Sequence, residues 1–169
     1  FIAGNNAGDA IASGGNYNTL VGNEAGEALT TGDQNVAVGY QALEDNDEGI
    51  RNVAIGTTAL TSDTKGEAST AIGHGALFAQ NFTSSTTSNN TAVGYHAGVN
   101  VTTGTENTIV GSLAGDAMTD ADRNTAVGYQ ALTTNTKSDR NTAIGRSALE
   151  NLNHTSVTSG LNTAIGHGA

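Results

Sequence analysis

The sequence predicts an all-β fold, a parallel β-solenoid or β-roll of about ten coils, and three observations support this prediction. A short pattern recurs along the 169 residues: Asn, Thr or Val, Ala, Val or Ile, Gly, two variable residues, Ala. The residue before the glycine is β-branched in nine copies, which favours strands over helices. The chain has no proline, a residue that would remove a hydrogen bond from a sheet ladder.

The pattern glycines define the length of the repeat. Successive glycines are 17 or 18 residues apart, except for two intervals of 21 residues, and every fourth interval completes a larger unit of 72 residues. Such a period is too short for the common helical repeats. We therefore expect residues 1–169 to form one repeat domain, with one glycine marking each coil. The glycines are Gly4, Gly22, Gly39, Gly56, Gly73, Gly94, Gly111, Gly128, Gly145 and Gly166.

Each position of the pattern has an expected structural role, which the unit from Asn124 to Ala131 illustrates. We expect Val127, directly before the glycine, to face the interior together with the Thr column two residues earlier, and the Asn column to form a ladder of side-chain bonds. Gly128 should adopt a turn conformation with positive φ. Ala131 and the other alanine column would then form a flat outer face.

One large side chain per coil is kept at one of two positions. The position four residues after the glycine is either Leu or Gly, and where it is Gly an apolar residue follows three positions later. This compensation is what a packed interior requires. The leucines are Leu43, Leu60, Leu77, Leu132 and Leu149, and the apolar residues that replace them are Ile11, Leu29, Val101 and Met118.

A single coil this thin does not bury enough apolar surface to offset the entropy of ordering its backbone. Stacking covers part of that surface, and the alanine face is left for other chains. We therefore expect a homo-oligomer, with a homotrimer as the favoured assembly.

Three segments of the chain resemble a known family of repeats. NTAVGYQAL (124–132), NVAVGYQAL (35–43) and NTAIGRSAL (141–149) look like repeats of bacteriophage tail-fibre shafts, and they are also similar to the head repeats of trimeric autotransporter adhesins. The period is longer than in the adhesins and the Asn-to-Gly distance is one residue shorter, which favours the tail-fibre resemblance. The resemblance implies a trimeric, intertwined β-roll or β-helix, and because Ala169 lies in mid-repeat we expect a fragment of a longer fibre.

Composition and motifs argue against several other classes of protein. The formal net charge of −10 opposes nucleic-acid binding, and no apolar run is long enough to insert into a membrane. No nucleophile elbow, phosphate-binding glycine loop or zinc spacing occurs, so we predict no enzyme, no catalytic residue, no cofactor and no metal site. The acidic run at 44–49 and other acids such as Asp63 and Asp139 are expected in solvated segments. His74 and His167 directly follow pattern glycines and His96 lies one residue further. We expect these histidines at the surface, as copies that are not adjacent in the stack of coils.

The two 21-residue coils are the best candidates for recognition, because loops on a rigid scaffold commonly carry it. The candidate receptor-contact residues are Phe78, Asn81 and Phe82 in the first long coil and Asn151 and His154 in the second. Phe78 and Phe82 could stack on a sugar, and the alternative is a bulge whose aromatic residues are buried.

These observations predict a rigid trimeric segment of a viral tail fibre that positions or contributes binding to a host-surface glycan or protein. Such a protein belongs on the virion or at the cell surface. The alternatives are the head of a bacterial trimeric adhesin, an ice-binding solenoid and a fibre-borne polysaccharide depolymerase. If the Thr column faces inward, as we expect, it is unavailable to ice.

Overall fold

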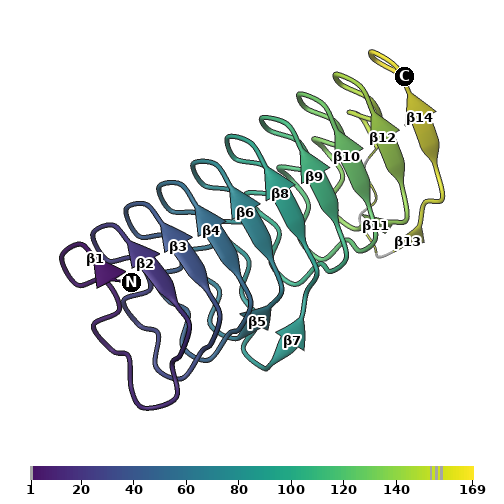
Figure 1. The fold of residues 1–169 in the computed structure, drawn as a ribbon. Coiled ribbons are helices and arrows are strands. Elements are labelled where there is room, and N and C mark those ends of the chain that lie inside the picture. The colour runs from purple at the N-terminus through teal and green to yellow at the C-terminus, as the bar shows by residue number, and fades with distance from the viewer. Residues whose placement is uncertain (1, 153, 155, 157) are drawn as a thin grey trace.

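The computed structural model describes residues 2–152, 154, 156 and 158–169, and these residues form a parallel β-solenoid without a helix. One ten-stranded sheet runs along the whole rod (Figure 1). Its strands in order are β1 (Ile2–Ala3), β2 (Thr19–Val21), β3 (Val36–Val38), β4 (Val53–Ile55), β6 (Thr70–Ile72), β8 (Thr91–Val93), β9 (Thr108–Val110), β10 (Thr125–Val127), β12 (Thr142–Ile144) and β14 (Thr163–Ile165).

All pairings in this sheet are parallel and join equivalent positions of the repeat. Thr125 pairs with Thr142, Ala126 with Ala143, and the same register holds along the sheet. The predicted all-β solenoid with stacked repeats is therefore confirmed. Each strand is only two or three residues long, so the fold depends on the contacts between coils.

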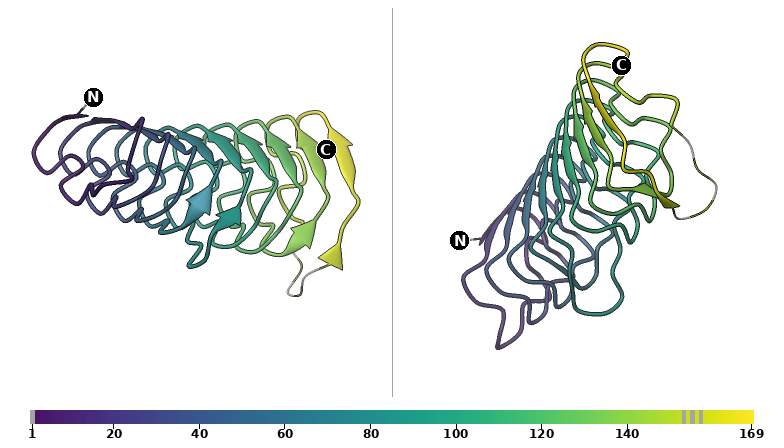
Figure 2. Two further views of the ribbon diagram at one scale, coloured as in Figure 1. Left: turned by 60° about the horizontal axis from the view of Figure 1, so that its bottom comes forward. Right: turned by 90° about the vertical axis from the view of Figure 1, so that its right-hand side faces the viewer.

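The two long coils keep this register by adding a strand elsewhere. In the first, β7 (Thr86–Thr87) pairs with β5 (Gly66–Glu67) of the preceding coil, and in the second, β13 (Thr158–Ser159) pairs with β11 (Ser138–Asp139). Both two-stranded sheets lie away from the main sheet, as Figure 2 shows. The four extra residues therefore enlarge the coil locally and leave the main sheet continuous.

The orientation predicted for the main strands is wrong. In the three-residue strands from β2 to β12, the middle residue, such as Ala37 or Ala126, is completely buried, whereas its two neighbours face outward. In the last strand, β14, the middle residue is half-buried. Val127 is half-buried on the outer surface and Ile144 is 38% exposed. The alanine column that includes Ala131 is also buried, except for Ala169 in the last coil. Small residues occupy the interior because the Leu of each coil already fills much of its narrow cross-section.

The glycine prediction is confirmed. Gly128 has a φ of 134°, and a β-carbon built on it would lie 2.5 Å from the carbonyl oxygen of Gly145 in the next coil. The corresponding glycines of the other coils have φ values between 130° and 141°. Glycine is therefore required both by the backbone conformation and by the close approach of successive turns.

The compensation between the two large-residue positions is also confirmed. Leu43 and Leu60 are fully buried, and so are Leu29, Val101 and Met118 in coils that have glycine in place of that leucine. In coils that have the leucine, the residue three positions after it also faces the interior and is often polar. These buried polar residues are Asn46, Asp63, Gln80 and Asn135.

The asparagine column forms a buried ladder, mostly through bonds to the backbone. Asn107 Oδ1 accepts the backbone N–H of Asn124 at 2.9 Å, and Asn107 Nδ2 donates to the carbonyl of Ala121 at 2.8 Å. Direct side-chain bonds also occur, as from Asn141 Nδ2 to Asn124 Oδ1 at 3.0 Å. The ladder therefore links successive coils on both sides of Ser69, the one position of the column without asparagine, and satisfies backbone groups that are closed to water.

Candidate functional site

The outward side chains of the main sheet form one surface, which we call the strand face. It consists of the first and third residues of each three-residue strand, and the structure leaves these side chains half-buried or exposed. One column is β-branched and apolar: Val21, Val38, Ile55, Ile72, Val93, Val110, Val127, Ile144 and Ile165. The other column contains seven threonines and two valines: Thr19, Val36, Val53, Thr70, Thr91, Thr108, Thr125, Thr142 and Thr163.

The strand face changes two expectations. The apolar surface open to other chains is made of Val and Ile, not of the buried alanines on which the oligomer prediction was based. The threonines face outward, so the reason given against ice binding is also wrong. Both corrections follow from the same reversal of strand orientation, because a shift of one residue moves every side chain to the opposite face.

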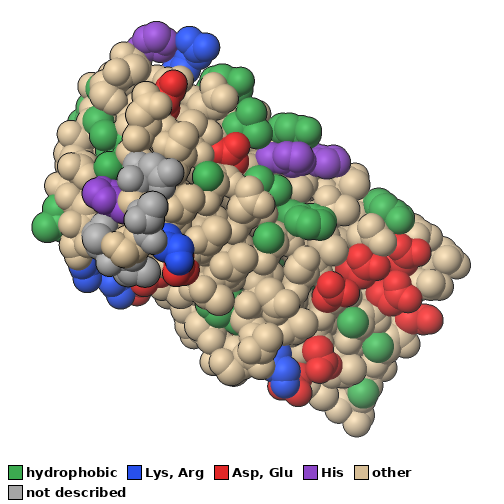
Figure 3. Space-filling model, turned by 180° about the vertical axis from the view of Figure 1, so that it is seen from behind, with side chains coloured by type: hydrophobic (Ala, Val, Ile, Leu, Met, Phe, Trp, Pro, Cys, Tyr) green, Lys and Arg blue, Asp and Glu red, His purple; other side chains and the backbone are tan. Residues whose placement is uncertain are grey.

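A second candidate is a cluster of three stacked aromatic rings. Tyr95 and His96 lie parallel, with ring centroids 4.1 Å apart and an interplanar angle of 9°. His74 of the preceding coil stacks on both, at 5.4 Å from Tyr95 and 5.2 Å from His96. The expectation that the histidine copies are not adjacent in the stack of coils is wrong for His74 and His96. Figure 3 shows histidine side chains that adjoin one another on the surface of the rod, next to hydrophobic side chains.

Gly75 is the sequence feature that could have predicted this cluster. Gly75 and His96 occupy the same repeat position in consecutive coils, and the ring of His96 lies over Gly75. A β-carbon at Gly75 would be 2.7 Å from Cδ2 of His96. The missing side chain thus makes room for the ring, which then reaches His74.

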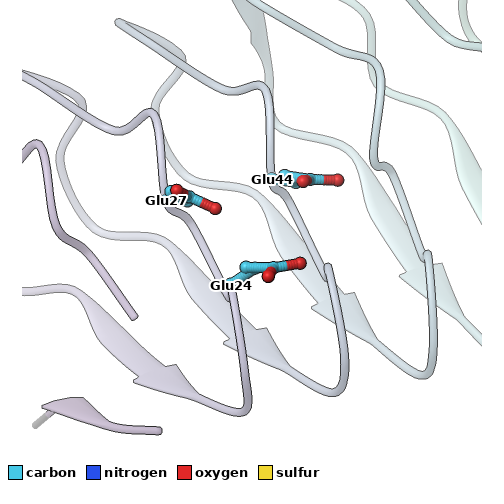
Figure 4. A group of neighbouring side chains, drawn as sticks. All are labelled: Glu24, Glu27 and Glu44. Carbon is cyan, nitrogen blue, oxygen red and sulfur yellow. The ribbon is translucent and has the colours of Figure 1, made fainter. Parts of the chain in front are cut away.

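A third candidate is a group of acidic residues near the start of the rod. Single carboxylate oxygens of Glu24, Glu27 and Glu44 lie within 4.8 Å of one another, and Figure 4 shows these side chains on adjacent coils. Gln41 Nε2 donates to Glu24 and to Glu44, both at 3.0 Å. Burial, followed by the charge of neighbouring Asp45, raises the pKa of Glu44. The group is a surface carboxylate cluster that a cation would neutralise, and sequence analysis singled out only its last member.

A fourth feature is the buried carboxyl group of Asp63, which we expected at the surface. It accepts backbone N–H groups from Gly66 and Phe82 at 3.1 and 3.0 Å, and Nε2 of Gln80 donates to it at 2.6 Å. Gln80 also donates to Ser69, the residue that replaces asparagine in the ladder. This network fixes the first long coil against its neighbours. Asp139, also expected at the surface, is buried and accepts the N–H of Asp122 at 2.9 Å.

Burial raises the pKa of Asp63 despite these hydrogen bonds. The folded protein therefore binds this proton more tightly than the unfolded chain, so stability falls as the pH rises from the unfolded to the folded pKa of the group. We expect the urea midpoint of the wild type to decrease across that acidic window and then to level off. In Asp63→Asn this decrease should be smaller. Urea denaturation at a series of pH values tests this, with Asp9→Asn, which removes an exposed carboxylate, as the control.

The candidate receptor-contact residues differ in how far the structure exposes their side chains. Phe82 is only 7% exposed and fixes the base of the long coil, whereas Phe78 is 40% exposed. Asn81 is exposed and accepts a hydrogen bond from Thr64 Oγ1 at 3.1 Å. Asn151 is exposed and His154 is half-buried, and three neighbours in that coil (153, 155 and 157) lie outside the described residues. The alternative of a bulge with a buried aromatic residue therefore applies to Phe82 alone.

The fold defines the chain as a parallel β-solenoid repeat protein with an apolar and threonine-bearing strand face. No protein-family model, no curated protein and no solved structure matches it. Among the described residues, no helix has the length and apolar character needed to cross a bilayer.

Proposed function

We propose that the chain is a rigid structural and adhesive segment of a viral tail fibre, assembled as a homotrimer through the strand face. The observation that carries this proposal is the column of Val and Ile side chains, which follows the outer side of the sheet along the rod. Contiguous apolar surface of this kind marks an interaction site. In the assembled fibre the rod holds binding groups at a distance from the virion, directed at a host-surface glycan or protein.

Identical chains are the natural partners for this face. Every coil presents the same two columns, so a second copy aligned with the first repeats each contact at every coil. Burying part of each Val or Ile is worth about 1 kcal/mol per side chain, which accumulates over the rod. The resemblance to trimeric tail-fibre shafts favours three chains over two. The head of a bacterial trimeric adhesin, the alternative family, would use the same assembly.

Two lysines on the strand face should separate the chains. In the double variant Val110→Lys, Val127→Lys, assembly would bury charged groups without partners, at a cost well above that of leaving them in water. We expect sedimentation of the wild type to give the mass of three chains. The double variant should dissociate into single chains at protein concentrations at least tenfold higher than those at which the wild type dissociates. Asn151→Lys, which places the same charge outside the strand face, should assemble like the wild type. A wild type that sediments as a folded monomer would exclude the homotrimer.

The outward threonines favour ice binding as a second candidate. Regularly spaced threonine hydroxyl and methyl groups beside Val and Ile can order water into an ice-like array. Such a face works best when it is flat, and the coils of this rod turn progressively relative to one another (Figure 2, right). The same preparation distinguishes the two functions, since a trimer that covers the face should show no thermal hysteresis, whereas an ice-binding monomer should show it.

A further inference from the structure

We infer that the rings of His74, Tyr95 and His96 form a binding site for an uncharged saccharide on the side of the rod. This inference adds a binding site to the proposed fibre segment, but the site is contained within one chain and does not depend on trimer assembly. The three residues come from two consecutive coils: His74 lies at the start of the first long coil, directly after Gly73, and Tyr95 and His96 lie at the start of the next coil, directly after Gly94.

The cluster is exposed although its rings are stacked. Tyr95 is 53% exposed, and His74 is also exposed. Stacking fixes the orientation of the rings before any ligand arrives, so little side-chain entropy remains to be lost on binding. Such a preorganised aromatic surface fits the C–H-bearing face of a sugar ring.

Hydroxyl groups flank the rings on the neighbouring coils. His74 and Tyr95 occupy the position directly after the pattern glycine, and in the coils before and after them this position is Thr57 and Ser112. Because equivalent positions of adjacent coils follow one another along the rod, these hydroxyls lie on either side of the stacked pair. Together with the Tyr95 hydroxyl and the imidazole nitrogens, they can donate to and accept from sugar hydroxyls.

Charge favours an uncharged ligand. The chain has a formal net charge of −10, and residues 1–50 contain eight acidic residues and no lysine or arginine. None of the four ion pairs formed by the described residues involves the aromatic cluster. A sulfated or sialylated glycan would therefore meet repulsion from the net negative charge of the chain. A neutral glycan is bound by stacking and hydrogen bonds, which this cluster supplies.

The test is a printed array that carries neutral oligosaccharides of glucose, galactose, mannose and N-acetylglucosamine beside sulfated and sialylated ones. We expect the wild type to bind at least one neutral oligosaccharide and no anionic one. For that oligosaccharide, titration should show Tyr95→Ala to bind about tenfold more weakly, the effect of losing one aromatic stacking contact. Tyr95→Phe, which keeps the ring, should remain within a few-fold of the wild type.

Tyr40→Ala is the matched control, because Tyr40 occupies the same repeat position and is 48% exposed but lies outside the ring cluster. It should bind like the wild type. Absence of binding to every neutral oligosaccharide, binding to anionic ones only, or an equal loss in Tyr40→Ala and Tyr95→Ala would each overturn the inference. A wild type that binds only an unglycosylated protein would also overturn it. Sedimentation of the same samples measures the oligomeric state independently. A failure of saccharide binding can therefore be distinguished from a failure of the proposed homotrimer.

Discussion

Gly128→Ala should destabilise the protein by about 3–5 kcal/mol, because it combines backbone strain with a collision between coils. The backbone at this position has a φ of 134°, a region that residues with a β-carbon rarely adopt. The added carbon would also lie 2.5 Å from the Gly145 carbonyl oxygen, and 2.6 Å from the carbonyl carbon of that residue. Relief requires the two coils to separate, which would weaken the pairing of β10 with β12. Urea denaturation at fixed protein concentration measures the loss.

Gly168→Ala separates strain from collision. Gly168 also has a positive φ, of 64°, but a β-carbon there would meet no atom within 4 Å. This variant should lose only about 1–2 kcal/mol, the usual cost of a left-handed residue that has a side chain. If the two variants were equally destabilised, the close approach of successive glycines would have no energetic role.

Asn107→Ala should cost about 2–4 kcal/mol, the second largest effect that we expect. The substitution removes the acceptor of the buried Asn124 N–H and the donor to the Ala121 carbonyl. It also removes the weaker bond from Asn107 Nδ2 to Asn90 Oδ1 at 3.2 Å. Alanine cannot replace these groups and the interior excludes water, so two backbone groups would be left without partners.

The control for the ladder is Asn100→Ala, which removes one hydrogen bond at the surface. Asn100 is exposed, and its Nδ2 donates to the Asp116 carbonyl at 2.6 Å. Water can replace that bond, so the variant should lose less than about 1 kcal/mol. Comparable losses in Asn100→Ala and Asn107→Ala would show that the buried ladder contributes no more than an exposed hydrogen bond.

Much of the fold could be predicted from the repeat. The spacing of the glycines predicted parallel stacking, and the pairing of Thr125 with Thr142 follows it. Each coil keeps one large apolar side chain, either at the position of Leu43 or at the position of Leu29. This compensation predicted a filled interior, because only a packed core conserves volume in this way. These features are local to the repeat, and each recurs often enough to be recognised in the sequence.

The candidate site could be predicted less well, because it depends on contacts between coils. Phe78 was singled out and is exposed, but the stacking of His74 on His96 was not expected. That contact requires both the register of two coils and the space left by Gly75. Asp63 resembled a surface acid in sequence, and only the path of the first long coil brings Gln80 and the N–H of Phe82 to its carboxyl group.

The sequence by itself determined the period, the parallel register and the turn glycines, since these follow from side-chain size and backbone sterics within one repeat. Only the tertiary structure decided which face of each strand is buried. The alternation of Ala126 and Val127 is compatible with either orientation, because both residues are apolar. The width of the coil selects alanine for the interior, and the Val and Ile side chains are thereby left on the outside.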